Sequence, residues 1–291
     1  MAEQKNPYAA PSAPIADFHA PQTRGVFIRE GQSVPAGQGW TWWRQGFAIF
    51  RASPWMWMLM VVVLMGVFLA AGAVLGAIGF SMMRSPSVLI LVSGVMGLAL
   101  SIVYPIFEGG LMLAARDTDE AEGPTVGHLF AGFSQSAGTL ATVGGLLLVG
   151  NIVIQVVVGA VFGMGFTKGA AGDPGAMIQQ GALVFLIYLA LTIPLMMAFW
   201  FAPALVVFNG LSAIDAMRSS FVGCLKNIVP FLIYGLVGLG FGILLGLLLG
   251  ILIAVTRGLA IILMLAVLLS IVPIILGSIY SGYRDIYTAR S

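Results

Sequence analysis

The sequence predicts an all-α membrane protein whose six transmembrane helices form three repeats of an interfacial amphipathic helix followed by a helical hairpin. Of its 291 residues, 59% are hydrophobic and 8% are charged, whereas about a quarter of an average soluble chain is charged. Six apolar runs are each long enough for the roughly 20 residues that cross a hydrocarbon core. They lack the alternation of a membrane β-barrel, so their peptide groups must be satisfied within helices.

The first 39 residues differ from the rest of the chain, because they contain five prolines and many small residues but no periodic apolar face. Such a segment buries too little apolar surface to fold, and we expect a disordered cytoplasmic tail. Several arginines precede the first apolar run, which is not the pattern of a cleaved signal peptide. We therefore divide the chain into a tail over residues 1–39 and a six-helix transmembrane domain over residues 40–291.

The six predicted spans follow one another with short connections. They cover residues 55–80, 88–115, 139–166, 182–208, 228–255 and 259–280. The boundary between the last two rests on only three residues, Thr256, Arg257 and Gly258. Ten of the 13 Lys and Arg residues lie on the side of the N-terminus and three on the other side, namely Arg84, Lys168 and Arg257. The positive-inside bias therefore predicts that both termini are cytoplasmic.

A threefold repeat is indicated by the segments that precede the hairpins. Each has apolar residues at spacings of three and then four, which places them on one helical face. The three sets are Trp40, Trp43 and Phe47; Val126, Leu129 and Phe133; and Ile214, Met217 and Phe221. The repeats would cover residues 40–116, 124–208 and 212–284, with Pro105, Pro203 and Pro273 kinking each second helix. The alternative is that apolar helices of similar length merely look alike.

Aromatic and basic residues at the inner ends of the helices are typical of membrane anchoring. Five of the six tryptophans surround the entrance of the first span, where indole rings settle at the level of the headgroups. The expected anchoring residues are Trp40, Trp42, Trp43, Arg44, Arg51, Trp55, Trp57, Arg218 and Lys226. Ordinary anchoring and a specific lipid site are both compatible with this pattern. Trp42 and Ile49 fall on the opposite face, so the first short helix can also pack against the protein.

Few polar side chains fall inside the spans, and they form the candidate intramembrane site. Glu108 is the only carboxylate in a span. Because a charged side chain is costly inside a membrane, Glu108 is a candidate functional residue. Its closeness to the inner end also allows a structural role beside the break made by Pro105. Asn151 and Gln155 lie on one face near mid-depth. They either hydrogen-bond to another helix or line a substrate path.

A glycine stripe marks the fifth span. Gly238, Gly242, Gly246 and Gly250 recur every fourth residue, which produces a groove that another backbone can approach closely. We expect packing within the chain, with a homo-oligomer contact and pore lining as alternatives.

The sequence lacks the residues of familiar catalytic sites, and we expect no catalytic residue, cofactor or metal. No nucleotide-binding loop, metalloprotease histidine pair or nucleophile elbow occurs, so an enzyme is not expected. Two histidines and the lone Cys224 are too few for a zinc site and exclude an intrachain disulfide. The acidic loop of Asp117, Asp119, Glu120 and Glu122 does not have the spacing of a calcium-binding loop. A net charge of +2 does not favour a nucleic-acid partner.

Short motifs near both ends resemble a known family. The tail contains Asn6, Pro7 and Tyr8 in an Asn-Pro-Tyr-Ala-Ala-Pro sequence that resembles the start of several bacterial membrane protein families. The stretch from Pro35 to Trp40, followed by Trp43, Gly46, Phe47 and Phe50, and the ending from Ser281 to Tyr287 resemble the BPSS-type family of proteobacterial multipass inner-membrane proteins. This resemblance implies an inner-membrane location and carries no assigned activity.

Two functional hypotheses follow from these patterns. The first is a non-enzymatic membrane scaffold or adaptor, in which the cytoplasmic face and the tail motif contact a protein partner while lipids surround the spans. The alternative is a transporter or channel for a lipid or a small, mostly apolar molecule, which would place Asn151, Gln155 and Glu108 around one cavity. A homo-oligomer is compatible with either.

Overall fold

The computed structural model describes residues 25–81, 86–169, 174–256 and 259–289. Its helices are α1 (Gln38–Ala52), α2 (Pro54–Ser81), α3 (Pro86–Asp119), α4 (His128–Gln135), α5 (Ala137–Gly169), α6 (Pro174–Phe199), α7 (Ala202–Asn209), α8 (Ala213–Lys226), α9 (Ile228–Thr256) and α10 (Leu259–Tyr287). Two short strands, β1 (Val26–Phe27) and β2 (Thr288–Ala289), pair antiparallel. In this part of the chain, six helices are long and apolar enough to cross a membrane, which confirms the predicted number of spans.

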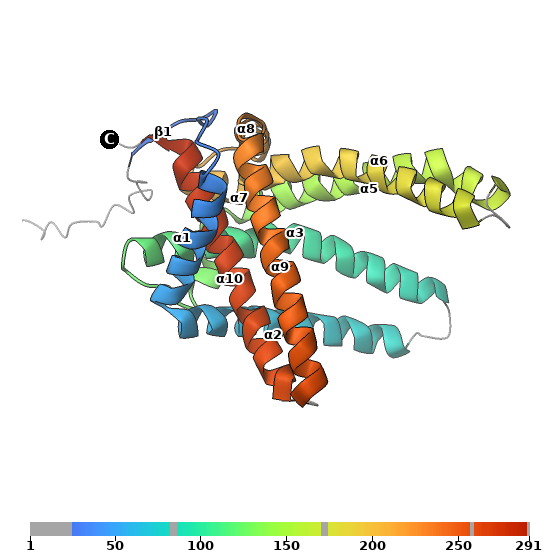
Figure 1. The fold of residues 1–291 in the computed structure, drawn as a ribbon, viewed down its shortest axis with the longest axis horizontal. Helices are drawn as coiled ribbons and strands as arrows, with labels where there is room; N and C mark the ends of the chain where they lie inside the picture. The colour runs from blue at the N-terminus through green and yellow to red at the C-terminus, as the bar shows by residue number, and fades with distance from the viewer. Residues whose placement is uncertain (1–24, 82–85, 170–173, 257–258, 290–291) are drawn as a thin grey trace, which may run out of the picture.

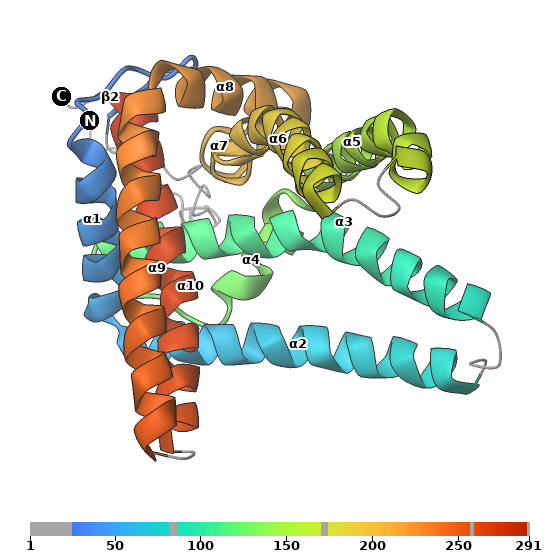
Figure 2. The same cartoon turned by 45° about the vertical axis from the view of Figure 1, so that its right-hand side comes forward.

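Three helical hairpins extend from one compact base (Figures 1 and 2). The hairpins are α2–α3, α5–α6 and α9–α10, and they leave the base in different directions. The base consists of the short helices α1, α4, α7 and α8 together with the C-terminal parts of α3 and α10. Its core contains large side chains that are almost completely buried, among them Trp42, Leu129, Leu205, Tyr283 and Tyr287. The tightest packing of the molecule is therefore in the base.

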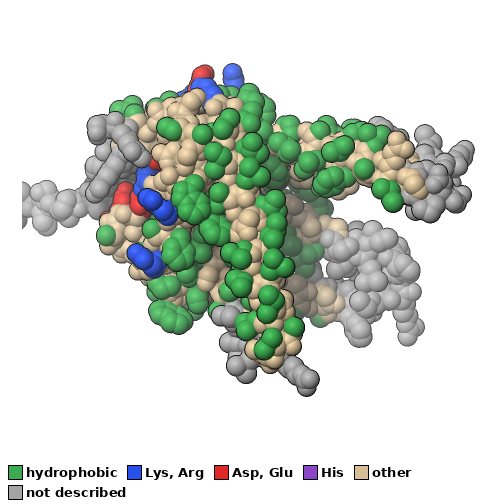
Figure 3. Space-filling view, in the orientation of Figure 1, with side chains coloured by type: hydrophobic (Ala, Val, Ile, Leu, Met, Phe, Trp, Pro, Cys, Tyr) green, Lys and Arg blue, Asp and Glu red, His purple; other side chains and the backbone are tan. Residues whose placement is uncertain are grey.

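The hairpins, by contrast, present apolar side chains outward along their length. None of the most hydropathic window of α9 is buried, and Leu239, Leu247 and Ile251 are each at least 60% exposed. Figure 3 shows hydrophobic side chains along the α5–α6 and α9–α10 hairpins and charged side chains over the base. In water this surface would drive aggregation, whereas in a bilayer it contacts lipid tails of the same polarity. The burial pattern thus follows directly from the composition of the spans.

Each of α1, α4 and α8 packs mainly against a hairpin other than the one it leads into. Helix α1 lies along α10 and α9, α4 lies along α3, and α8 lies along α6. Two of these contacts depend on glycine, because a Cβ at Gly46 would lie 2.3 Å from the carbonyl oxygen of Ile274, and one at Gly132 would lie 2.1 Å from that of Ile106. The absence of a side chain therefore lets the helix backbones touch.

The fourth candidate span ends at Asn209, within one residue of the prediction, but its helix is interrupted. Instead of one kinked helix over residues 182–208, α6 ends at Phe199 and α7 begins at Ala202. Pro203 lies in the first turn of α7, where its missing N–H leaves no helical hydrogen bond unmade. Proline here starts a helix, whereas Pro105 and Pro273 lie inside α3 and α10 as predicted.

The N-terminal segment also differs from the prediction. Residues 1–24, including Asn6, Pro7 and Tyr8, lie outside the described residues. Residues 25–39, which were predicted to be disordered, are instead ordered against the base, starting with the pairing of Val26 with Ala289. Hydrogen bonds from the backbone of this segment, described below, stabilise it without a periodic apolar face. Composition alone could not reveal these partners.

Candidate functional site

An N-terminal strap, residues 25–37, crosses the base and is fixed by polar contacts. The backbone N–H of Ile28 donates to the carbonyl of Tyr287 at 2.8 Å, and that of Gln32 donates to the carbonyl of Ile286 at 2.8 Å. The Gln32 side chain also donates to the carbonyl of Asp285 at 2.9 Å. These bonds extend the β1–β2 pairing, so the two ends of the described chain meet at one corner of the base (Figure 2).

Asn227 joins the strap to the end of α8. Its Nδ2 donates to the carbonyls of Gln32 at 2.9 Å and Gly223 at 2.8 Å, while its Oδ1 accepts from the N–H of Val34 at 2.8 Å. The amide is completely buried. A buried amide with both donors and its acceptor satisfied stabilises one geometry, because each alternative leaves a polar group unpaired. Asn227 is therefore the central polar contact of the strap.

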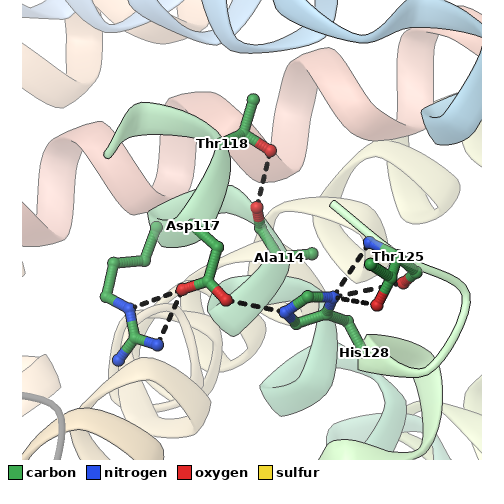
Figure 4. A network of polar contacts seen from close by, with 6 residues as sticks. Ala114, Asp117, Thr118, Thr125 and His128 are labelled. Atoms are coloured by element: carbon green, nitrogen blue, oxygen red, sulfur yellow. Dashed lines mark hydrogen bonds and ion pairs between the residues drawn. The ribbon is translucent and has the colours of Figure 1, made fainter. Parts of the chain in front are cut away.

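A second polar cluster connects α3 to α4 (Figure 4). Nε2 of His128 lies 2.8 Å from Oδ2 of Asp117, and the Arg116 guanidinium binds Oδ1 of Asp117 at 2.7 Å. Nδ1 of His128 lies 2.9 Å from the hydroxyl of Thr125. The hydrogen bond to Asp117 raises the pKa of His128, although partial burial opposes this shift. The cluster holds α4 against α3 and favours the charged imidazole.

Other charged groups of the acidic loop and the strap also form ion pairs. Arg284 of α10 binds Asp119 at the end of α3, and Arg29 of the strap binds Asp215 of α8 at 2.7 Å. The hydroxyl of Ser212 and the Arg29 guanidinium lower the pKa of Asp215. Two of the four carboxylates of the predicted acidic loop, Asp117 and Asp119, lie at the end of α3 and connect it to α4 and α10. Among the described residues, no group of three His, Cys, Asp or Glu side chains is arranged to hold a metal.

The predicted anchoring residues divide into exposed and buried groups. Trp55 is 81% exposed and Trp40 is 46% exposed, and Arg44, Arg51 and Arg218 are also exposed. Trp43 is half-buried and donates its indole N–H to the carbonyl of Tyr234 at 2.9 Å. Lys226 is exposed, but its Nζ donates to the strap carbonyl of Gly31 at 3.1 Å.

Two of these predictions are wrong. Trp42 and Trp57 are 1% and 0% exposed, so neither ring reaches lipid. The indole N–H of Trp42 donates to Oδ2 of Asp285 at 3.1 Å inside the base. The position of Trp42 opposite the predicted lipid face of its helix already indicated this contact with the protein. Nothing in the sequence around Trp57 indicated burial.

Glu108 lies in the packed part of α3 and is buried within the protein. Its side chain is 3% exposed and accepts a hydrogen bond from the hydroxyl of Tyr104, one turn earlier on the same helix. The other carboxyl oxygen, Oε2, has no hydrogen-bond partner among the described residues. A buried polar atom without a partner typically carries a free-energy penalty of about 1–3 kcal/mol. Glu108 therefore remains the candidate intramembrane polar residue.

Asn151 and Gln155 do not join Glu108. Gly109, beside Glu108, lies against Leu140 of α5, and Asn151 is eleven residues further along that helix, or about 16 Å. The Asn151 amide donates to the carbonyl of Leu147 in its own helix at 2.9 Å. Gln155 is exposed on the outer side of the helix. The single cavity expected for the transport alternative is therefore not formed by these three residues.

The glycine stripe of α9 packs within the chain at one position only. A Cβ at Gly238 would lie 2.8 Å from Cζ2 of Trp43, so this glycine makes room for the indole. Gly242, Gly246 and Gly250 have no neighbouring atom within 4 Å of an added Cβ among the described residues. Gly238 therefore packs within the chain, whereas no atom of the described residues fills the space beside the other three.

Sequence reasoning missed the polar contacts that organise the base. Asn227, Gln32 and Asp285 belong to segments whose periodicity is weak, and their partners lie more than 190 positions away in the sequence. The ending from Ser281 to Tyr287 did stand out as a motif. Its tyrosines prove to be core residues, with Tyr283 donating to Oδ1 of Asn209 at 2.7 Å and Tyr287 to the carbonyl of Ser219 at 2.8 Å.

Comparison with known proteins agrees with a location in the membrane. A probable inner membrane protein of Burkholderia thailandensis is 30% identical over 269 residues, which cover 87% of this chain and 92% of the relative. No family model and no solved structure matches the chain. The aligned region necessarily includes most of the hairpins and the base. The chain therefore belongs to the family of this inner-membrane protein, in agreement with the BPSS-type resemblance of its terminal motifs.

Proposed function

We propose that this protein is a non-enzymatic scaffold or adaptor of the inner membrane, which presents its N-terminal tail to a protein partner in the cytoplasm. The observation that carries this proposal is the strap. Residues 25–37 are fixed to α8 and α10 by hydrogen bonds with partners distant in sequence. An N-terminal tail without a function would not require attachment to the base at a fixed position.

The attachment has a physical consequence for recruitment. A segment that starts from a fixed point explores a limited volume, which raises the local concentration of a bound partner beside the base. The motif of Asn6, Pro7 and Tyr8 precedes Gly25 by fewer than 20 residues. The partner would therefore be held within a short distance of the charged residues that surround the strap, including Arg29 and Arg218.

We further propose that the chain consists of three copies of one unit, a short helix followed by a hairpin. In support, Gly46 of α1 touches the carbonyl directly after Pro273, and Gly132 of α4 touches the carbonyl directly after Pro105. Ser220 takes the equivalent position in α8, and its hydroxyl donates to the carbonyl of Met197 in α6 at 2.7 Å. Each short helix would then close against the preceding hairpin, with α1 closing the ring against the last one.

The recruitment proposal is tested with a deletion that leaves the strap intact. The full chain and a variant lacking residues 1–24 are tagged at the C-terminus, crosslinked in cells and compared by quantitative mass spectrometry. We expect both to give the same thermal stability, with at least one crosslinked protein lost from the deletion variant. A double substitution of Pro7 and Tyr8 by alanine should lose the same protein, while alanine at Pro21 and Gln22 should retain it. Identical crosslinked proteins in all four samples would refute the proposal.

The cytoplasmic placement is tested separately. Residues 289 and 25 meet at the same corner, so a reporter fused after Ser291 reports on the side of the strap as well. A reporter that fluoresces only in the cytoplasm should be active there, and a phosphatase that needs the periplasm should be inactive. The opposite result would place the tail outside and remove cytoplasmic recruitment.

One observation favours the transport alternative. An apolar cavity of about 660 Å³ lies between α2, α3 and α5, and Tyr104, the partner of Glu108, lines it with Phe68 and Leu147. A small apolar molecule in this cavity would lie one helical turn from Glu108. Reconstituted protein should then move a fluorescent lipid analogue across vesicles, and Glu108→Gln should slow this movement. Equal rates for the variant, the wild type and empty vesicles would eliminate transport by this route.

A further inference from the structure

An apolar groove runs between α1, α9 and α10. It has a volume of about 630 Å³, and its lining includes Trp40, Trp43 and Phe47 from α1, Gly242 from α9 and Ile274 from α10. Trp40 stacks on Phe241 with ring centroids 5.9 Å apart, and Trp43 meets the edge of the same ring at 6.0 Å. These aromatic contacts and the indole bond of Trp43 to Tyr234 give the groove a fixed wall.

The groove has the length of one membrane leaflet. Its lining on α9 extends from Gly238 to Leu248, which is ten residues or about 15 Å of helix. The hydrocarbon core of a bilayer is about 30 Å thick, so one leaflet accounts for about 15 Å. The groove is empty beside Gly242, because no neighbouring atom lies within 4 Å of the position that its Cβ would take.

A cation borders this apolar surface. Among the described residues, Arg44 is the only charged one that lines the groove. It is exposed, and no ion pair to it is formed within the described ranges 25–81, 86–169, 174–256 and 259–289. An exposed guanidinium beside an apolar channel matches an amphiphile with an anionic head, because the guanidinium fork binds phosphate oxygens in pairs.

We propose that this groove binds an anionic phospholipid, with one acyl chain between α1, α9 and α10 and the phosphate at Arg44. The charge pattern favours a lipid over a second copy of the chain. Residues 228–256 and 259–280 contain no Asp or Glu, so a copy that docked through its own α9–α10 hairpin would bring no anion to Arg44. This proposal is independent of the scaffold function.

The experiment is native mass spectrometry of the full chain in detergent, titrated with phosphatidylglycerol or with phosphatidylcholine of the same acyl chains. We expect one phosphatidylglycerol to bind with about fivefold preference, corresponding to the roughly 1 kcal/mol that one arginine contributes toward anionic lipid. Arg44→Gln should abolish the preference. Arg51→Gln is the matched control, because Arg51 lies two turns along the same helix but does not line the groove.

A second pair of variants tests the groove itself. Gly242→Leu places a side chain in the open space and should reduce phosphatidylglycerol binding at least tenfold. Gly250→Leu, on the same stripe but outside the groove lining, should leave binding unchanged. Equal effects of the two arginine variants, or unchanged lipid binding by Gly242→Leu, would overturn the proposal. A dimer that forms without lipid and is lost in Gly242→Leu would show that a second copy occupies the groove instead.

Discussion

The crossing of α3 and α5 offers a sharp test of how glycine controls the packing of this protein. Gly144 of α5 is buried against α3, and a Cβ at this position would lie 2.3 Å from the carbonyl oxygen of Ser101 and 3.0 Å from Cα of Ile102. All its close neighbours are backbone atoms, so no side chain can rotate away. A Cβ at Gly145, the next residue, would have no neighbouring atom within 4 Å.

The expected effect of Gly144→Ala follows from this geometry. A carbon and a carbonyl oxygen in close contact are normally about 3.3 Å apart, so the two helices must separate by about 1 Å. Overpacking of this kind typically destabilises by about 1–3 kcal/mol. Both Gly144→Ala and Gly145→Ala gain helix propensity, which cancels when the two are compared. We therefore expect Gly144→Ala to be less stable than Gly145→Ala by about 1–3 kcal/mol, or roughly 5- to 150-fold in the unfolding equilibrium.

The measurement is reversible unfolding in mixed micelles, followed by the fluorescence of Trp200 and the other tryptophans as the fraction of denaturing detergent rises. Leu140 and Val143, which are completely buried on α5, would lose part of their dispersion contacts as the helices separate. The reasoning is refuted if the two alanine variants have the same free energy of unfolding, or if Gly145→Ala is the less stable one.

Three further predictions concern the base. Asn227→Ala should accelerate hydrogen exchange at residues 28–34, because it removes three hydrogen bonds of the strap and of α8. An unchanged rate of hydrogen exchange at these residues would contradict the central role of this amide. The pairing with Asp117 raises the pKa of His128 above its ordinary value of 6.5. This ion pair therefore contributes fully to the stability of the folded protein below pH 6.5, and the contribution is lost as pH rises through the raised pKa. The melting temperature of the wild type should therefore fall over that range relative to His128→Gln, and parallel curves would argue against the ion pair. Burial raises the pKa of Cys224 to about 12, so maleimide should label this thiol only after the protein unfolds. The exposed control, Leu225→Cys in a Cys224→Ser background, should react in the folded protein. Equal labelling rates for the two thiols would show that Cys224 is accessible.

The spans could be predicted from sequence because each carries its own signal. A run of about 20 apolar residues needs no partner to become a helix in lipid, since its backbone groups are satisfied locally. The predicted fifth span, residues 228–255, accordingly agrees with α9 (Ile228–Thr256) to one residue. The predicted sixth span ended at residue 280, but α10 continues to Tyr287 because Tyr283, Ile286 and Tyr287 are buried in the base.

The candidate site was predicted only in part. Glu108 stood out because a carboxylate among apolar residues is conspicuous in any sequence. Its distance from Asn151 depends on how α3 and α5 cross, which is set by the fit of Gly144 against Ser101. Likewise, the apolar groove needs α1 to lie along α9 and α10, although α1 precedes them by almost 200 residues.

Composition and local periodicity by themselves determined that this chain is helical and that six of its helices are long and apolar enough to cross a membrane. These properties depend on the transfer of each segment from water to hydrocarbon, which is a local free energy. Only the tertiary structure decided which hairpin each short helix packs against, that Trp57 is buried while Trp55 is exposed, and that the strap is ordered. Those features depend on shape and hydrogen bonds between distant residues such as Asn227 and Gln32, which no local pattern encodes.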